Sequence, residues 1–235
     1  MTLPILNSEP KYITTIPSTG QEIHFRPYLV KEEKVLLLAM ESEDNKQILN
    51  SISDTICACV KEDINVDKLT SFDIEFLFVK IRSKSVGETQ LIGMACEKCN
   101  FQNEIKIDLE SLTLNVKNQD SNIELDENTI LEMKWPSFKS LSDSGISDMK
   151  STDQLFAVIR NCLEAVQFND SRIEFKDYSD DEIYNFVDSL NSEQFSKLRV
   201  FIEKMPSLKH TVKFECTECK HENVHVLEGM QSFFA

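Results

Sequence analysis

Apolar and polar residues follow one another along the chain with two different periods, one typical of helices and one typical of strands. Residues 12–29 are predicted to form two short strands joined by a turn, because Thr, Ile and Phe cluster around turn-forming residues there. Apolar residues then recur with the helical period over residues 30–41, 45–61 and 70–84. The third of these helices carries two apolar stripes, so we expect it to be buried on two sides and to form the hub of the N-terminal half.

The period changes to two after Gly87, where strands are predicted around the first of two similar cysteine-containing segments. TQLIGMA leads into CEKCNFQN, and EIKIDL leads away from it. The same plan returns later, where LKHTVKFEC leads into CTECKHEN and ENVHVLEG leads away. Both copies close with an asparagine, Asn103 in the first and Asn223 in the second. Each C-x-x-C pair is therefore predicted to lie between the two strands of its own hairpin.

Between the two cysteine segments, the pattern predicts β structure followed by helices. LTLNVK and NIELDENTILEMKW are predicted to be strands with a turn at residues 126–128, and the Ser- and Asp-rich stretch 137–148 is predicted to be a loop. Three helices are then predicted from candidate N-terminal caps at Ser151, Ser179 and Asn191, each followed by an apolar periodic run. The predicted buried faces of these helices contain, in order, Leu155, Ile159, Cys162 and Val166; Ile183, Phe186, Val187 and Leu190; and Phe195, Leu198 and Ile202.

These elements predict an α+β fold class, in which helical segments combine with β-hairpins. Residues 1–85 are expected to form an N-terminal hairpin and a three-helix region. Residues 86–110 and 207–229 are expected to form one discontinuous, zinc-ribbon-like unit. Residues 111–206 are expected to be an insertion that is first β and then helical, so a long mixed α/β segment separates the two knuckles of a four-cysteine site.

Two C-x-x-C pairs in matching strand contexts indicate a tetrahedral metal site, because a two-residue spacer lets both sulfurs of a turn face one ion at about 2.3 Å. Four protein ligands leave no open coordination position, so the expected Zn²⁺ is structural. An iron–sulfur cluster on the same thiolates, or a redox pair at either C-x-x-C, is the alternative. The predicted ligands are Cys96, Cys99, Cys216 and Cys219.

The residue after the second cysteine of a knuckle often has a positive φ. Glycine is the usual residue at this position, but Asn100 and Lys220 follow the second cysteines here. Asparagine tolerates the left-handed conformation, whereas lysine adopts it less readily. The second knuckle therefore departs further from the usual pattern than the first.

Charge and composition exclude several classes of function. Forty acidic residues against 25 basic ones give a net charge of −15, which repels phosphate backbones and makes nucleic acid a disfavoured partner. The longest apolar run, residues 35–40, is far shorter than the roughly 18 residues of a membrane span. The N-terminus has no secretion signal, so a reducing cytoplasm is expected. Hydrolase, metalloprotease and dinucleotide motifs are missing, which predicts a protein without enzymatic activity.

Two longer stretches carry a family resemblance: RPYLVKEEKVLLLAMES from Arg26 and FDIEFLFVKIRSKSVGE from Phe72. They resemble the baseplate hub subunit, or hub assembly protein, family of T4-like contractile-tailed bacteriophages. The likeness is strongest over residues 20–110. It implies a protein that builds the central hub of the tail baseplate through contacts with other phage tail and hub proteins. The implied location is the host cytoplasm during assembly and the tail baseplate of the virion.

Two other functions are open alternatives at this point. One is a transient tail or tape-measure assembly chaperone that is absent from the mature virion. The other is a zinc-ribbon protein that binds nucleic acid, although the ribbon segments contain several glutamates among their lysines rather than a basic stripe with aromatic residues.

Overall fold

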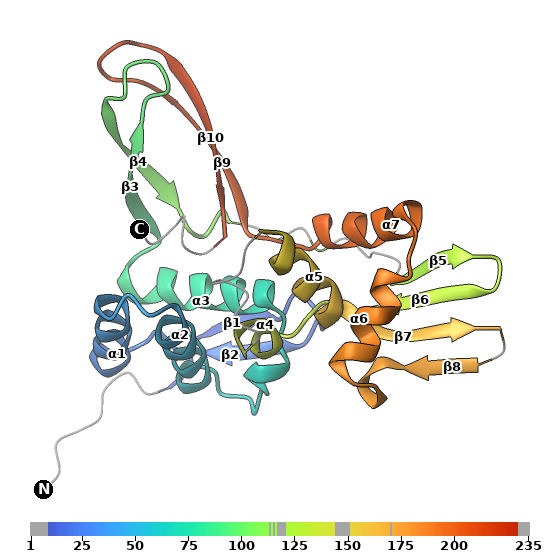
Figure 1. Cartoon of the computed structure of the whole chain (residues 1–235). Helices are drawn as coiled ribbons and strands as arrows, with labels where there is room; N and C mark the ends of the chain where they lie inside the picture. The colour runs from blue at the N-terminus through green and yellow to red at the C-terminus, as the bar shows by residue number, and fades with distance from the viewer. Residues whose placement is uncertain are drawn as a thin grey trace, which may run out of the picture. The chain divides into compact units, whose positions relative to one another are not determined.

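The chain divides into two units (Figure 1). Unit 1 comprises Met1–Val116 and Pro206–Ala235, and unit 2 comprises Lys117–Met205. The chain therefore leaves unit 1, forms unit 2 and returns to complete unit 1. The structure is a computed structural model that describes residues 9–112, 114, 116, 121–143, 151–169 and 171–229.

Unit 1 opens with an antiparallel hairpin and continues with three helices, as predicted. In the hairpin, Tyr12 lies opposite Phe25, and the two rings are 5.6 Å apart. A short 3-10 turn, η1 (Val66–Lys68), precedes the third helix. The elements are β1 (Tyr12–Thr15), β2 (Glu22–Phe25), α1 (Val30–Glu41), α2 (Asn45–Cys59) and α3 (Ser71–Val86).

Helix α3 is buried on two sides, as its two apolar stripes predict. Its first turn is fixed by a capping box, because the Asp73 carboxylate accepts the Thr70 N–H at 3.0 Å and the Thr70 hydroxyl accepts the Asp73 N–H. The same carboxylate accepts the Ser18 N–H at 2.9 Å, which ties the β1–β2 turn to the helix. Gly87, with φ +131°, ends the helix. The buried apolar residues of α3 are Phe72, Ile74, Leu77, Phe78, Val79 and Ile81.

Two β-hairpins complete unit 1, and we call them together the ribbon. The first pairs β3 (Thr89–Ala95) with β4 (Gln102–Asp108), and the second pairs β9 (Lys209–Glu215) with β10 (Glu222–Glu228), both antiparallel. Figure 1 shows the hairpins side by side. Alternate residues of the strands face inward, as the period of two requires. Between the hairpins lies a small core of Ile92, Met94, Ile107 and Val212.

A second cluster joins the base of the ribbon to helix α3. Val79 of α3 packs there with Leu109, Leu112 and Leu208, all buried. Backbone hydrogen bonds support this base, including one from the Leu109 N–H to the Glu88 carbonyl at 2.8 Å. The ribbon is thus attached to the rest of unit 1 by apolar packing as well as by the chain.

Unit 2 is a four-stranded antiparallel sheet with helices packed on one face. The strands lie in the order β5 (Asn122–Asp126), β6 (Thr129–Met133), β7 (Leu163–Phe168) and β8 (Ser171–Glu174). Leu131, Val166 and Ile173 lie opposite one another across three strands and face the helices. The remaining elements are α4 (Phe138–Asp143), α5 (Ser151–Cys162), η3 (Phe175–Asp177), α6 (Asp180–Asp188) and α7 (Ser192–Glu203).

The predicted caps of α6 and α7 are confirmed. The Ser179 hydroxyl accepts the Glu182 N–H, and the Asn191 side-chain oxygen accepts the Gln194 N–H at 2.9 Å. Each forms a full capping box, which is why these helices begin where they do. The side chain of Ser151, the third predicted cap, lies outside the described residues.

Several predictions for the inserted region are wrong. Part of the predicted loop 137–148 is helix α4, whose first residue, Phe138, is buried; residues 144–148 lie outside the described residues. The apolar period places Val166 on the face of a helix, but α5 ends at Cys162 and Val166 lies in strand β7. Strands β7 and β8 occupy a stretch predicted to be helical.

The predicted strand LTLNVK also fails where it is described. Its residues Leu112, Leu114 and Val116 belong to no strand, and its other three residues lie outside the described residues. Leu112 instead packs in the cluster at the base of the ribbon. The alternation of apolar residues in this segment reflects the packing of Leu112 and Leu114 at the base of the ribbon and not pairing with a neighbouring strand.

Candidate metal centre and apolar surface

Each C-x-x-C pair forms a knuckle at the tip of its hairpin, and the two knuckles have the same backbone hydrogen bonds. The Cys96 N–H donates to the Phe101 carbonyl at 2.9 Å, and the Cys216 N–H donates to the His221 carbonyl at 2.8 Å. Asn100 and Lys220 follow the second cysteines with φ of 58° and 60°. Lysine adopts this conformation although its Cβ makes it about 1–2 kcal/mol unfavourable.

The four predicted cysteine ligands converge, although the two pairs are far apart in the sequence. All four sulfur atoms lie within 4.8 Å of one another. The Cys96 and Cys219 sulfurs are 3.6 Å apart, as are those of Cys99 and Cys216. Sulfurs bound at about 2.3 Å to one tetrahedral Zn²⁺ would be about 3.8 Å apart. The donor set and its spacing therefore fit a single tetrahedral ion.

The backbone around the knuckles favours ionised sulfur at the first cysteine of each pair. Burial opposes ionisation of Cys96, but the N–H groups of Cys99 and Lys98 outweigh it and lower the pKa of the Cys96 thiol to about 6. The N–H groups of Cys219 and Glu218 likewise lower the pKa of Cys216. A lowered pKa favours the thiolate form, which is the form that binds a metal ion.

The second cysteine of the first pair behaves differently. The Phe101 N–H favours the Cys99 thiolate, but burial and the adjacent Cys219 and Cys216 sulfurs together raise the pKa of Cys99 to about 12. Four negative sulfurs at this spacing repel one another, and a divalent cation removes that repulsion. Metal binding would therefore release protons from the site.

Two buried asparagines lie directly behind the cysteines. Asn103 and Asn223 are 2% and 1% exposed, and each stands seven residues after the first cysteine of its pair. The sequence shows that they close both copies, but their contacts follow only from the convergence of the hairpins. Their identical position in the two copies was the signal from which a shared role could have been expected.

A second candidate site is an apolar surface on helix α1. This helix buries Leu36 and Ala39, yet Val30 on its opposite side is 79% exposed. At about 100° of rotation per residue, Leu37 and Leu38 fall on the same outward side as Val30. We call the exposed apolar residues of this helix the α1 surface: Val30, Val35, Leu37, Leu38 and Met40.

The helix that carries this surface is held firmly by buried charges. The Arg26 guanidinium donates to the Glu32 carboxylate at 2.9 Å and to the Ala58 carbonyl at 2.8 Å. Glu32 also accepts the Leu29 N–H at 2.8 Å. Burial alone would raise the pKa of Glu32, but the hydrogen bonds from Arg26 and Leu29 lower it below its ordinary value. Arg26, Leu29 and Glu32 all belong to the first stretch that carries the family resemblance.

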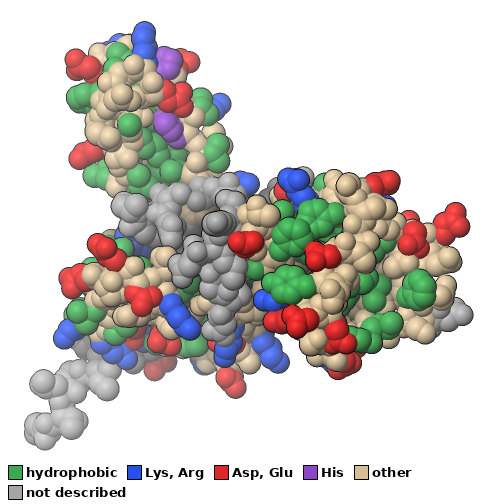
Figure 2. Space-filling view, viewed as in Figure 1, with side chains coloured by type: hydrophobic (Ala, Val, Ile, Leu, Met, Phe, Trp, Pro, Cys, Tyr) green, Lys and Arg blue, Asp and Glu red, His purple; other side chains and the backbone are tan. Residues whose placement is uncertain are grey.

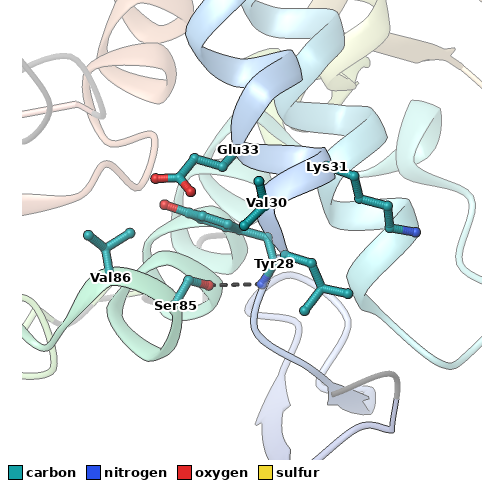
Figure 3. Close-up of a pocket in the computed structure, with 7 residues that line it drawn as sticks. Tyr28, Val30, Lys31, Glu33, Ser85 and Val86 are labelled. Carbon is teal, nitrogen blue, oxygen red and sulfur yellow. Dashed lines mark hydrogen bonds between the residues drawn. The ribbon is translucent and has the colours of Figure 1, made fainter. Parts of the chain in front are cut away.

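A pocket of about 460 Å³ lies where the start of α1 meets the end of α3. Figure 3 shows Val30 and Val86 at this pocket on either side of the Tyr28 ring. The Ser85 hydroxyl accepts the Tyr28 N–H at 2.9 Å and donates to the Ile81 carbonyl, so both of these hydrogen bonds are to backbone groups. Burial, reinforced by Glu33, raises the pKa of Tyr28 and keeps its phenol neutral, although Arg82 opposes the shift. The pocket is suited to apolar contact.

The acidic surface favours a protein partner over the phosphate backbone of a nucleic acid. Figure 2 shows acidic side chains across the visible face of both units. The two hairpins of the ribbon carry Glu104, Glu215 and Glu222 among their basic residues. No helix in the described part of the chain is both long and apolar enough to cross a membrane.

Comparison with known proteins gives one family. A family model described as "T4 bacteriophage base plate protein" matches residues 9–235, which is nearly the whole chain. No curated protein and no solved structure gives a match.

Proposed function

The chain belongs to the T4 bacteriophage base plate protein family, and on this premise we propose that it is a structural or assembly component of the tail baseplate hub. It acts through contacts with other tail and hub proteins and without an enzymatic step. It works in the host cytoplasm during assembly and in the tail baseplate of the virion. The observation that carries this proposal is the α1 surface.

The α1 surface has the properties of a contact site. Single exposed apolar residues are normal on a protein surface, but five on one helix are a concentration that favours a site of interaction. Leu37 and Leu38 are 55% and 56% exposed, on a helix already fixed by the Arg26–Glu32 ion pair. A partner that binds there does not have to order the helix, which lowers the entropic cost of association.

The occupant we propose is another baseplate hub protein that presents a row of apolar side chains. One of these side chains would enter the pocket between Val30 and Val86. A second copy of this chain is less suited, because two chains with a net charge of −15 repel each other. The partner therefore offers an apolar surface without a large negative charge.

Affinity purification from infected cells tests this proposal. Tagged wild-type protein is expected to co-purify with baseplate hub proteins of the same phage, identified by mass spectrometry. Leu37→Gln combined with Leu38→Gln is expected to reduce their recovery about tenfold or more, because buried apolar anchors dominate interface energetics. Both positions are exposed in the free protein, so the fold is retained.

Val200→Gln is the matched control, because Val200 is 42% exposed on helix α7 of unit 2. It should leave recovery of the hub proteins unchanged. Equal recovery with the Leu37 and Leu38 variant would exclude the α1 surface as the contact site. A dimer of this chain that dissociates in the same variant would replace the hub partner with a second copy.

The same proteomic measurement on purified virions separates a structural component from an assembly factor. Stoichiometric presence in the virion supports the structural role. Presence in assembly intermediates together with absence from virions supports the transient tail or tape-measure chaperone. Salt-dependent binding to DNA or RNA would instead support the nucleic-acid alternative, against the net charge.

We also propose that Cys96, Cys99, Cys216 and Cys219 hold a structural Zn²⁺. Sulfurs that all lie within 4.8 Å of one another surround one ion and leave no room for the several iron and sulfide atoms of a cluster. Four thiolate ligands close the coordination sphere, so the ion would cross-link the two hairpins rather than activate a substrate.

A further inference from the structure

The two asparagines behind the cysteines make reciprocal contacts between the knuckles. The side-chain oxygen of Asn223, on the second hairpin, accepts the N–H of Glu97 in the first knuckle at 2.9 Å. The side-chain oxygen of Asn103, on the first hairpin, accepts the N–H of Thr217 in the second knuckle at 2.9 Å. Glu97 and Thr217 occupy the same place, directly after the first cysteine of each pair.

The amide nitrogens of the same side chains are directed back to their own hairpins. Asn103 donates to the Phe101 carbonyl at 3.0 Å, and Asn223 donates to the His221 carbonyl at 2.9 Å. Each carboxamide thus bridges its own hairpin and the opposite knuckle. The two bridges are related by the internal repeat, in which each asparagine follows its first cysteine by seven residues.

Asn103 also reaches a sulfur of the opposite knuckle directly. The Asn103 amide nitrogen lies 3.7 Å from the Cys216 sulfur, and the Thr217 hydroxyl donates to the Asn103 oxygen at 3.0 Å. A donor beside a thiolate fixes the direction in which that sulfur presents its lone pairs. The contact runs from the first hairpin to the second, as the backbone contacts do.

We propose that Asn103 and Asn223 are positioning residues that clasp the two knuckles together and set the geometry of the four-cysteine site. Both carboxamides are almost fully buried, and loss of either removes the acceptor of an N–H in the opposite knuckle. The clasp is made by protein groups alone, so its hydrogen bonds can be tested separately from metal binding. Its effect on the metal rests on the zinc site proposed above.

Zinc affinity and amide exchange together test the clasp. Asn103→Ala and Asn223→Ala are each expected to weaken zinc binding about 10- to 100-fold, measured by competition with a chromophoric chelator, as for other groups that orient metal ligands. In the protein as purified, Asn103→Ala should accelerate hydrogen exchange at the Thr217 amide and spare that of Glu97. Asn223→Ala should accelerate exchange at Glu97 and spare Thr217.

Asn161→Ala is the control, because the Asn161 side chain donates to the Ala157 carbonyl in unit 2, away from the knuckles in the sequence. It should change neither zinc affinity nor exchange in the knuckles. Wild-type zinc affinity in both knuckle variants, or unchanged exchange at Thr217 and Glu97, would overturn the clasp. If wild-type protein binds no zinc, the metal proposal fails, and the exchange pattern of the two variants still decides whether the clasp exists.

Discussion

The ribbon of unit 1 and the sheet of unit 2 hold their strands together in different ways. The core between the hairpins of the ribbon contains four buried residues, whereas the core of unit 2 contains twelve, from the sheet and helices α5, α6 and α7. Isolated two-stranded sheets are marginally stable, and a sheet packed against helices is much more so. With so small a core, the ribbon relies on the hydrogen bonds of the clasp and on the proposed metal site, whereas unit 2 relies on apolar burial.

Removing the metal is the strongest test of that difference. Purified protein is expected to contain about one zinc per chain, and Cys219→Ser or a strong chelator should unfold the ribbon, since structural zinc contributes on the order of 10 kcal/mol to small domains. Hydrogen exchange should show lost protection in β3, β4, β9 and β10 and unchanged protection in β5 to β8.

Cys57→Ser provides the control for this measurement, because Cys57 is an exposed cysteine of α2 outside the cluster. It should leave both zinc content and exchange unchanged. If the ribbon stays fully protected in metal-free protein, the small apolar core and the clasp suffice to keep it folded.

The converse change removes apolar core from unit 2. Leu131 is fully buried at the centre of the sheet, and Leu131→Ala is expected to cost about 2–5 kcal/mol of the free energy of unfolding of unit 2. Zinc content should stay at the wild-type value. Urea unfolding followed by circular dichroism measures the first quantity, and elemental analysis measures the second.

Val200→Ala serves as the matched control, since this exposed aliphatic side chain should change the unfolding free energy by less than about 0.5 kcal/mol. Loss of zinc in Leu131→Ala would mean that the two units do not respond independently to the loss of apolar core.

The smallest expected effect compares asparagines in the two units. Asn191 caps helix α7, and Asn191→Ala should cost unit 2 about 1 kcal/mol without changing zinc affinity. Asn191→Ser should restore stability, because serine caps about as well as asparagine. A loss of zinc affinity as large as that of Asn103→Ala would mean that asparagine loss acts through general destabilisation. Chelator competition and thermal unfolding measure the two quantities.

The sequence predicts those parts of the fold whose signals are local. Helices α1, α2 and α3 each match an apolar period, and the caps at Ser179 and Asn191 follow from the spacing of two residues within one turn. The four cysteines could be assigned to one site because both C-x-x-C pairs supply two thiols and both lie between two predicted strands. None of these inferences depends on knowing which distant segments meet.

Strands β7 and β8 escape prediction because their signals compete with a helical one. Val166 follows Cys162 at a spacing of four, which continues the apolar stripe of α5, and no turn residue separates α5 from Leu163. The strand forms because Val166 pairs with Leu131 and Ile173. Asn169 is a local clue in the sequence, because asparagine is common in tight turns. It has a positive φ of 52° in the turn between the strands.

The clasp could not be predicted for a different reason. Asn103 and Asn223 satisfy no local rule, because their partners Thr217 and Glu97 are 114 and 126 residues away. Only the folded ribbon brings these groups within hydrogen-bonding distance. The repeat marks the positions, whereas the pairing is a property of the tertiary structure.

The order of the ribbon along the chain has a consequence during protein synthesis. Cys99 and Cys216 are 117 residues apart, and all of unit 2 is translated between them. Because domains fold as units while the chain emerges from the ribosome, unit 2 can fold before the second knuckle has been synthesised. A chain that stops within unit 2 therefore exposes half a site with two unpaired thiols. The ribbon can therefore be completed only after all of unit 2 has been translated.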